Sequence, residues 1–396
     1  MKSCSNKNLS IRSLCLLAAA IALAIQPLAG QSQSYRVLYS FTNNALAGEY
    51  PSSSVVRDPK GNLYGIALGG VFGRGVVFEL SNTGNESVLY NFLGSDGDGD
   101  VPDSMSFRDS AGNLFGTTFQ GGAYSFGTVF KLDRQGRETI VYNFCAETPC
   151  TKGAYPGGVI PGKNGSLYGI TYAGGDFSCA ITGCGTVFKI NHDGALTLLH
   201  AFGGANGDGQ NPNAGLVLDA FNNVYGTTQY GGAYGRGTVF QLTSYGNETV
   251  AYSFDGGANG AYPNGGVARD AAGNFYGTTY QGGTYNFGTI FKIDTLGQFS
   301  VLYSFPGGAS GANPYASLSL DLQGNIYGTT YSGGSQNFGT IFKLDTSGNE
   351  TVLHNFGKEG DGVHPSGLLI DASGSLYGTT YQGGRYNYGS VFELVP

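Results

Sequence analysis

The chain has 396 residues, of which 69 are glycine and only 12% are charged, with 27 tyrosines, 25 phenylalanines and no tryptophan. A composition rich in glycine and aromatic β-formers, and poor in charged helix formers, favours an all-β protein. The formal net charge of −7 argues against nucleic acid and anionic membrane surfaces as partners, because both repel an acidic protein.

The first 30 residues are predicted to be a signal peptide. Three basic residues within the first twelve positions precede an apolar run from Leu14 to Ile25, and small residues follow at Ala29 and Gly30. This order is typical of secretory signals, and the apolar run is short for a membrane span. We therefore expect a secreted, periplasmic or extracellular protein that has no membrane insertion once residues 1–30 are removed.

A dipeptide marker repeats along the rest of the chain. At one position of the repeat, Tyr-Gly or Phe-Gly is found in each of seven copies, from Tyr64-Gly65 to Tyr377-Gly378, at intervals of 50 to 57 residues. Four strands in about 50 residues form one blade of a β-propeller. Each interval holds four short runs of β-forming residues, with examples at residues 263–270, 376–380, 127–132 and 301–305.

We therefore predict an all-β fold over residues 36–396, a seven-bladed β-propeller with four antiparallel strands per blade. The N-terminal strand at residues 36–41 is expected to pair with residues 389–395 and to close the ring. A β-solenoid is the alternative, but its marker would recur at half the period, and the Gly-Gly pair does not. The blades are expected approximately at residues 51–92, 102–144, 156–202, 212–254, 263–305, 314–356 and 365–395 plus 36–41.

The connections predict the strand order and the two faces of the ring. Asp-x-x-Gly, a tight-turn signature, joins runs one and two and again runs three and four, whereas a Gly-Gly loop joins runs two and three. The link from run four to the next proline is the only one long enough to cross between blades. Run one is therefore innermost. The Gly-Gly loops and crossovers share one face, the loop face, and the tight turns form the other, the turn face.

The unit Leu-Tyr-Gly-Thr-Thr-x-x-Gly-Gly-x-x-x-x-Gly-Thr-Val-Phe-Lys-Leu resembles the tandem repeat of the GloVer-containing proteins, which are exported bacterial proteins. The similarity covers about residues 36–396, and all seven copies carry the Gly-Gly pair and a Val-Phe or Ile-Phe dipeptide. The stretch Asp-x-x-Gly-Asn-Leu-Tyr also looks like the start of NHL-type propeller repeats. The resemblance implies an exported propeller and no particular activity.

Four cysteines lie beyond the predicted signal peptide, all in or beside the third blade. An exported protein with an even number of cysteines favours disulfides. Because two separate insertions carry them, we expect Cys145 to bond Cys150 and Cys179 to bond Cys184. A four-cysteine zinc site is the alternative.

An acidic cluster lies in the crossover into the second blade. Its Asp-x-Asp-x-Asp spacing resembles the opening of a calcium loop, but Phe107 stands where the closing glutamate is expected. Calcium binding and a solvated acidic loop therefore both stay open. The candidate ligands are Asp96, Asp98, Asp100 and Asp103.

The loop face is the predicted ligand face, because the turn face offers only tight turns. Tyrosines flank the Gly-Gly pairs among Gln and Asn side chains, and rings beside amides suit neutral sugars; capping of the blades is the alternative role. Blade three has the longest Gly-Gly loop, so Asp176 and Phe177 are expected to give specificity. The candidate ligand-binding residues are Tyr124, Tyr172, Tyr230, Tyr234, Tyr280, Tyr285, Tyr331, Tyr381, Tyr386, Asp176 and Phe177.

Catalysis has little support in the sequence. The repeated aspartates occupy one turn position, His200 and His354 replace a packed tyrosine, and His192 and His364 have no evident nucleophile beside them. We expect an exported, non-catalytic binding module for a carbohydrate-like ligand, monomeric and with no required cofactor. A structural or cell-surface protein-interaction propeller is the alternative, and a propeller enzyme acting on polysaccharide is the third reading.

Overall fold

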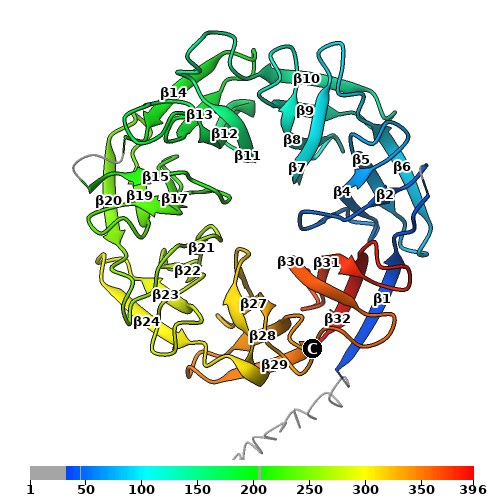
Figure 1. Ribbon diagram of the computed structural model, residues 1–396, viewed down its shortest axis with the longest axis vertical. Coiled ribbons are helices and arrows are strands. Elements are labelled where there is room, and N and C mark those ends of the chain that lie inside the picture. Colours follow the sequence, from blue (N-terminus) through cyan, green and yellow to red (C-terminus); the bar gives the residue numbers. More distant parts are fainter. Residues whose placement is uncertain (1–32, 45, 204–206) are drawn as a thin grey trace, which may run out of the picture. The chain divides into compact units, whose positions relative to one another are not determined.

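The computed structural model describes residues 33–44, 46–203 and 207–396, and the predicted signal peptide lies outside them. Residues Gln33–Pro396 form one compact unit. This unit is a ring of seven blades whose strands run from the centre outward (Figure 1). The predicted seven-bladed propeller with four antiparallel strands per blade is therefore confirmed.

The first four blades extend from the start of β2 at Gly48 to the end of β20 at Ser253. Blade one contains β2 (Gly48–Glu49), β3 (Val56–Arg57), β4 (Leu63–Gly69), β5 (Val76–Leu80) and β6 (Glu86–Asn91). Blade two contains β7 (Gly99–Arg108), β8 (Leu114–Gly121), β9 (Thr128–Leu132) and β10 (Glu138–Asn143). Blade three contains β11 (Ala154–Pro161), the 3₁₀ turn η1 (Lys163–Gly165), β12 (Leu167–Ala173), β13 (Thr186–Ile190) and β14 (Leu196–Ala201). Blade four contains β15 (Gly209–Gln210), β16 (Val217–Leu218), β17 (Val224–Thr228), β18 (Tyr230–Gly231), β19 (Thr238–Leu242) and β20 (Glu248–Ser253).

The last three blades complete the ring. Blade five contains β21 (Ala268–Arg269), β22 (Phe275–Thr279), β23 (Thr289–Ile293) and β24 (Phe299–Ser304). Blade six contains the 3₁₀ turn η3 (Gly308–Ser310), β25 (Ala312–Pro314), β26 (Ser319–Leu320), β27 (Ile326–Ser332), β28 (Thr340–Leu344) and β29 (Glu350–Asn355). Blade seven contains β30 (Gly362–Ile370), β31 (Leu376–Gly383), β32 (Ser390–Val395) and β1 (Ser34–Ser40).

The two ends of the propeller meet in blade seven. Strand β1 pairs antiparallel with β32, with Ser34 opposite Val395 and Ser40 opposite Ser390. The sheet order β1-β32-β31-β30 makes β1 the outermost strand of this blade, beside the reddest strands in Figure 1. The predicted closure is confirmed, and it leaves blade seven with the same four-strand width as the others.

The hydrophobic core is divided among the seven blade junctions. At the junction of blades one and two, Val77 of one blade packs against Phe130 and Leu132 of the next. A phenylalanine that follows each outermost strand completes each junction, and its ring lies edge-on to the third-strand phenylalanine of the next blade, as in Phe92 on Phe130 at 5.2 Å. Alternate residues of the third strand thus face opposite neighbours, as period-two spacing requires.

The repeated aspartates form the tight turns that the sequence predicts. Asp270 accepts the Asn274 backbone N–H at 2.9 Å and the Asn274 side-chain amide at 2.7 Å. Burial works to raise the pKa of Asp270, but these hydrogen bonds together lower it below its ordinary value. The turn face is therefore built from ionised, self-contained Asx turns. Within the described residues no helix is long and apolar enough to cross a membrane.

Candidate functional site on the loop face

The Gly-Gly loops and the blade crossovers emerge together. In each of the seven blades the second glycine of the pair donates its N–H to a carbonyl of the incoming crossover, as in Gly122 to Asp98 at 2.6 Å and Gly334 to Gly308 at 2.7 Å. Both kinds of loop therefore form one continuous face. This agrees with the face predicted from strand alternation.

A backbone contact holds each innermost strand against the preceding blade. The residue before each crossover proline has a positive φ, between 51° and 59°, although none of the seven is glycine. Its N–H donates to the preceding blade, as in Tyr262 to the Arg236 carbonyl at 2.8 Å. The proline packs on a glycine of that blade: a Cβ on Gly288 would lie 2.8 Å from Pro314. Only a glycine fits at this position, because its φ is +95° and no room is left for a side chain.

This contact fixes the direction of seven side chains that sequence reasoning missed. Several stack on the aromatic residue that precedes the neighbouring Gly-Gly pair: Phe119 on Tyr155 with centroids 4.8 Å apart, and Tyr331 on His364 at 4.3 Å. The sequence carried a signal for these side chains, because each belongs to the residue before a proline that recurs at the same position of every repeat. The seven are Tyr50, Val101, Tyr155, Asn211, Tyr262, Asn313 and His364.

The predicted tyrosines fall into two sets. Tyr172, Tyr280, Tyr331 and Tyr381 precede Gly-Gly pairs and form an inner set; Tyr331 and Tyr381 contact the side chains fixed by the prolines. Tyr124, Tyr234, Tyr285 and Tyr386 follow Gly-Gly pairs and form an outer set, each beside the tyrosine of an outermost strand, whose pKa they help to raise. Tyr230 packs edge-on to Tyr262. The predicted tyrosines are therefore distributed around the loop face from blade to blade and do not form one pocket.

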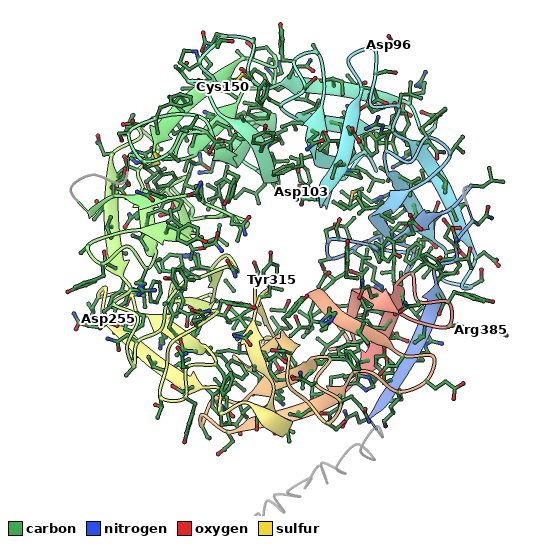
Figure 2. All side chains as sticks on the ribbon, in the orientation of Figure 1. Asp96, Asp103, Cys150, Asp255, Tyr315 and Arg385 are labelled. Carbon is green, nitrogen blue, oxygen red and sulfur yellow. A yellow bond between two sulfur atoms is a disulfide. The ribbon has the colours of Figure 1, made fainter. Side chains whose placement is uncertain are left out.

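The residue after each crossover proline lies in the innermost part of its blade, within a strand in blades two, three and seven. Asp103 of blade two and Tyr315 of blade six both project toward the centre of the ring (Figure 2). Unlike most of the repeat, this position varies from blade to blade. Its occupants are Ser52, Asp103, Gly157, Asn213, Asn264, Tyr315 and Ser366.

The axial side chains from different blades influence one another. Burial raises the pKa of the Tyr315 hydroxyl, a side-chain hydrogen bond with Asn213 lowers it, and the charge of Asp103 raises it, with a net upward shift. Asp103 is reached by water, yet the surrounding blades desolvate it enough to raise its pKa to about 6, with no charged partner contributing. Tyr315 also lies 6.3 Å, centroid to centroid, from both Tyr280 and Tyr331. Two further aromatic rings therefore flank Tyr315, and its hydroxyl is influenced by the amide of Asn213 and the charge of Asp103.

A family model described as the Gloeobacter/Verrucomicrobia repeat matches the chain in three overlapping segments, residues 24–182, 106–320 and 295–396. The chain belongs to the Gloeobacter/Verrucomicrobia repeat family. The resemblance predicted from the seven-fold unit is thereby confirmed. Among curated proteins, none matches the chain.

Solved structures share the fold of this Gloeobacter/Verrucomicrobia repeat protein at low identity. A domain described as extracellular, from a hybrid two component system of B. thetaiotaomicron, is 12% identical with a TM-score of 0.56, covering 91% of this chain and 39% of that one. A gluconolactonase from Xanthomonas campestris is 12% identical with a TM-score of 0.46, covering 92% and 90%. A luciferin-regenerating enzyme is 12% identical with a TM-score of 0.45, covering 92% and 95%. At these identities the likeness concerns the propeller alone.

The two predicted disulfides are present in blade three of the repeat protein. Cys145 is bonded to Cys150 in the incoming crossover, and Cys179 to Cys184 in the Gly-Gly loop. Both lie on the loop face. Disulfides are compatible with an extracellular location.

The specificity residues predicted in blade three lie in the Gly-Gly loop, just before the second disulfide. Asp176 accepts the Ser178 N–H at 2.7 Å, and its carbonyl accepts the Cys184 N–H at 2.9 Å. Phe177 is 36% exposed. Asp176 therefore shapes its own loop, and Phe177 presents part of its ring to solvent.

The four aspartates proposed for calcium are not gathered by the structure. The Asp98 carboxylate accepts the Leu93 and Gly99 N–H groups, both at 2.6 Å, and Asp100 pairs with Arg74 at 2.7 Å. Asp96 lies in the crossover loop at a positive φ, and Asp103 points to the axis. Within the described residues no three of these carboxylates lie close enough to share an ion.

One other group has the composition of a metal site. His200, Asp208 and Glu248 place one ligand atom each within 4.8 Å of one another at the junction of blades three and four. The same positions at another junction hold His354 and Asp361, where His354 Nε2 lies 2.8 Å from the carboxylate and its ring stacks on Tyr35. Because the arrangement recurs, we interpret it as a contact that joins blades.

Proposed function

We propose that the protein is an exported, non-catalytic binding module whose carbohydrate-like ligand docks on the loop face at the axis of the propeller. The observation that carries the proposal is that Asp103 and Tyr315 project toward the centre of the ring from two different blades (Figure 2), with Asn213 of a third blade influencing the Tyr315 hydroxyl. In an array of near-identical repeats, residues needed only for folding repeat, whereas Asp103 and Tyr315 each occur once at this position. They define one site per ring.

The chemistry of this site suits a sugar. The rings of Tyr280, Tyr315 and Tyr331 offer flat apolar faces of the size of a pyranose, and Asn213 offers both a donor and acceptor for hydroxyl groups. The desolvated carboxylate of Asp103 accepts hydrogen bonds strongly once water is displaced. The ring of Tyr331 stacks on His364, whose backbone is held by the preceding blade, so less of its side-chain entropy is lost on binding.

The test is a glycan array with the protein lacking residues 1–30, followed by calorimetry on the glycan that binds. Tyr315→Ala and Asp103→Asn should each weaken binding about tenfold or more, since each removes a stacking face or a charged acceptor worth about 1.5 kcal/mol. Tyr280→Ala and Tyr331→Ala should weaken it less. Tyr245→Ala is the matched control, because Tyr245 is 90% exposed and lies in a tight turn of the turn face.

Binding should also depend on pH. The pKa of Asp103 is about 6 in the free protein, so lowering the pH below 6 should protonate the acceptor and weaken binding in the wild type but not in Asp103→Asn. A glycan that binds with equal affinity to all axial variants would place the site elsewhere. Loss of binding only in Tyr234→Ala and Tyr285→Ala would instead place the binding site at the outer tyrosines. It would favour a flatter surface of the kind that binds another protein.

A further inference from the structure

A cavity lies on the turn face, where only tight turns were expected and little room to bind. It has a volume of about 420 Å³ at the junction of blades seven and one. Its lining includes Arg36 of β1, Arg57 of β3, Lys60 of the β3–β4 turn and the tight turn at residues 81–84. The sequence predicted that the tight turns leave little to bind with on this face, and this junction nevertheless holds a cavity.

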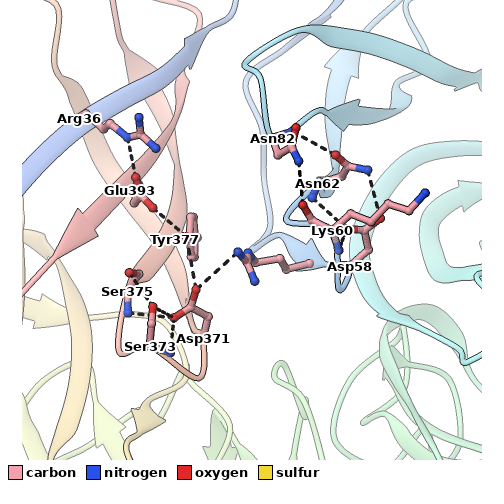
Figure 3. A network of polar contacts seen from close by, with 11 residues as sticks. Arg36, Asp58, Lys60, Asn62, Asn82, Asp371, Ser373, Ser375, Tyr377 and Glu393 are labelled. Atoms are coloured by element: carbon pink, nitrogen blue, oxygen red, sulfur yellow. Dashed lines mark hydrogen bonds and ion pairs between the residues drawn. The ribbon is translucent and has the colours of Figure 1, made fainter.

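The cavity occurs where the ring closes. Its outer wall is β1, which comes from the start of the propeller, and its other walls come from blade one and from β31 and β32. Figure 3 shows the two sides of the junction facing each other, with Arg36, Glu393 and Tyr377 on one side and Lys60, Asn62 and Asn82 on the other.

Two of the three cations that line the cavity, Arg36 and Arg57, are each paired with a carboxylate. Arg36 Nε lies 2.5 Å from Glu393, whose other oxygen accepts the Tyr377 hydroxyl at 2.7 Å. The Arg57 guanidinium lies 3.7 Å from Asp371 and 5.2 Å from the centroid of the Tyr377 ring. At 3.7 Å the second pair is loose, so Arg57 keeps donor capacity.

The third cation has its backbone fixed and its amine free to serve a ligand. The Lys60 N–H donates to Asp58 at 2.8 Å, and its carbonyl accepts the Asn82 side-chain amide at 2.8 Å. Among the ion pairs of the described residues, none uses the Lys60 amine. The lining holds three cations and one carboxylate, Glu393, in a protein whose net charge is −7.

No other junction combines these residues. Where β1 has Arg36, the outermost strands of the other six blades have Ser87, Thr139, Thr197, Thr249, Ser300 and Thr351. Blades two and five have an arginine at the position of Arg57 but alanine in place of Lys60. Blade three has a lysine in that turn, Lys163, and its amine donates to the Ala220 carbonyl at 2.6 Å. The positive cavity is therefore particular to the closing junction.

We propose that this cavity binds an oxyanion carried on a ligand of sugar-ring size, such as the carboxylate of a uronic acid, through Lys60 and Arg57. The hairpin of blade one supplies both a guanidinium, that of Arg57, and an ammonium, that of Lys60, to the lining. Both groups bind oxyanions, and 420 Å³ holds one such ring. The site is on the face opposite to the axial site and does not depend on it.

The test uses the whole propeller, residues 31–396, with three probes: galacturonate, galactose of the same size without charge, and inorganic phosphate. Galacturonate and phosphate should bind, more weakly as salt is added, and galactose should not bind at this site. Lys60→Gln should reduce galacturonate affinity about five- to tenfold, as expected for one charge-assisted contact. Lys163→Gln removes the same charge from the same turn of another blade and should have no effect.

The axial and closing-junction sites are distinguished by Tyr315→Ala, which should leave galacturonate affinity unchanged. Equal losses in Lys60→Gln and Lys163→Gln would mean that only the overall charge matters and would overturn the proposal. So would undetectable galacturonate binding, or its loss in Tyr315→Ala. Arg57→Gln, checked for an unchanged melting temperature, should weaken binding at least as much as Lys60→Gln.

Discussion

Closure of the ring can be tested with one buried phenylalanine. Phe41 follows β1 and Phe254 follows β20, and both side chains are fully buried. Each ring lies edge-on to a phenylalanine of the next blade, at 5.2 Å and 5.3 Å, and each N–H donates to a glycine carbonyl at 3.0 Å. Phe41 differs only in that its strand is not joined by a turn to the rest of its blade.

If the closure holds in solution, the two positions should be energetically equivalent. Phe→Ala in a packed core costs about 3–5 kcal/mol, so Phe41→Ala and Phe254→Ala should lower stability by similar amounts. If β1 were only loosely attached, Phe41→Ala would cost almost nothing, because its ring would already be exposed in a large share of molecules. The difference between the two outcomes is several times the error of the measurement.

The assay is guanidinium unfolding followed by circular dichroism and by tyrosine emission, which is usable because the chain has no tryptophan. Midpoints should be compared, because a seven-blade array need not unfold in one step. Phe221→Ala is the control, since Phe221 is 78% exposed and its removal should cost less than about 0.5 kcal/mol. A Phe41→Ala midpoint equal to that of the control would refute the closure.

Three further predictions concern stability. Gly288→Ala should cost about 2–3 kcal/mol, because its φ of +95° and the crowding by the next blade add together, whereas Gly297→Ala, with open space around it, should cost about 1 kcal/mol in the same unfolding assay. Burial and a nearby carboxylate raise the pKa of Glu138 to about 8, so the folded state holds a proton that the unfolded state loses near pH 4.5, and stability falls as pH rises between these values. Glu138→Gln should therefore raise the free energy of unfolding at pH 8 by on the order of 1 kcal/mol after solvent screening is allowed for, and change it little at pH 4; a gain that is the same at both pH values would contradict the pKa. Replacing Cys179 and Cys184 by serine should cost about 2 kcal/mol, the loop entropy of a short bridge, and an unchanged midpoint would show that the bridge adds nothing.

The ring was predictable because its determinants are local and are repeated seven times. The Asp-x-x-Gly turns, the Phe-x-Leu spacing of the third strand and the separate strand at the start each fix one step of the topology without knowledge of the rest. The disulfides were predictable for the same reason, since Cys145 lies five residues from Cys150.

The axial site was not predictable in this way. Asp103, Asn213 and Tyr315 lie about a hundred residues apart in sequence, and they come near one axis only because the ring brings the inner edge of every blade there. Asp103 was grouped with three neighbouring aspartates, although the strand that follows its proline carries it away from them. The cavity beside Lys60 was also missed, because its walls come from opposite ends of the propeller.

The backbone contact at each crossover proline has a consequence for how such a protein can change. Main-chain atoms, a glycine and a proline make the contact, so the identity of the side chain before the proline is left almost free. The seven blades place Tyr, Val, Tyr, Asn, Tyr, Asn and His there, with φ varying by only 8° from the lowest to the highest value. Natural or engineered substitutions at these seven positions can therefore change the recognition surface one side chain at a time, while the backbone of the propeller keeps its geometry.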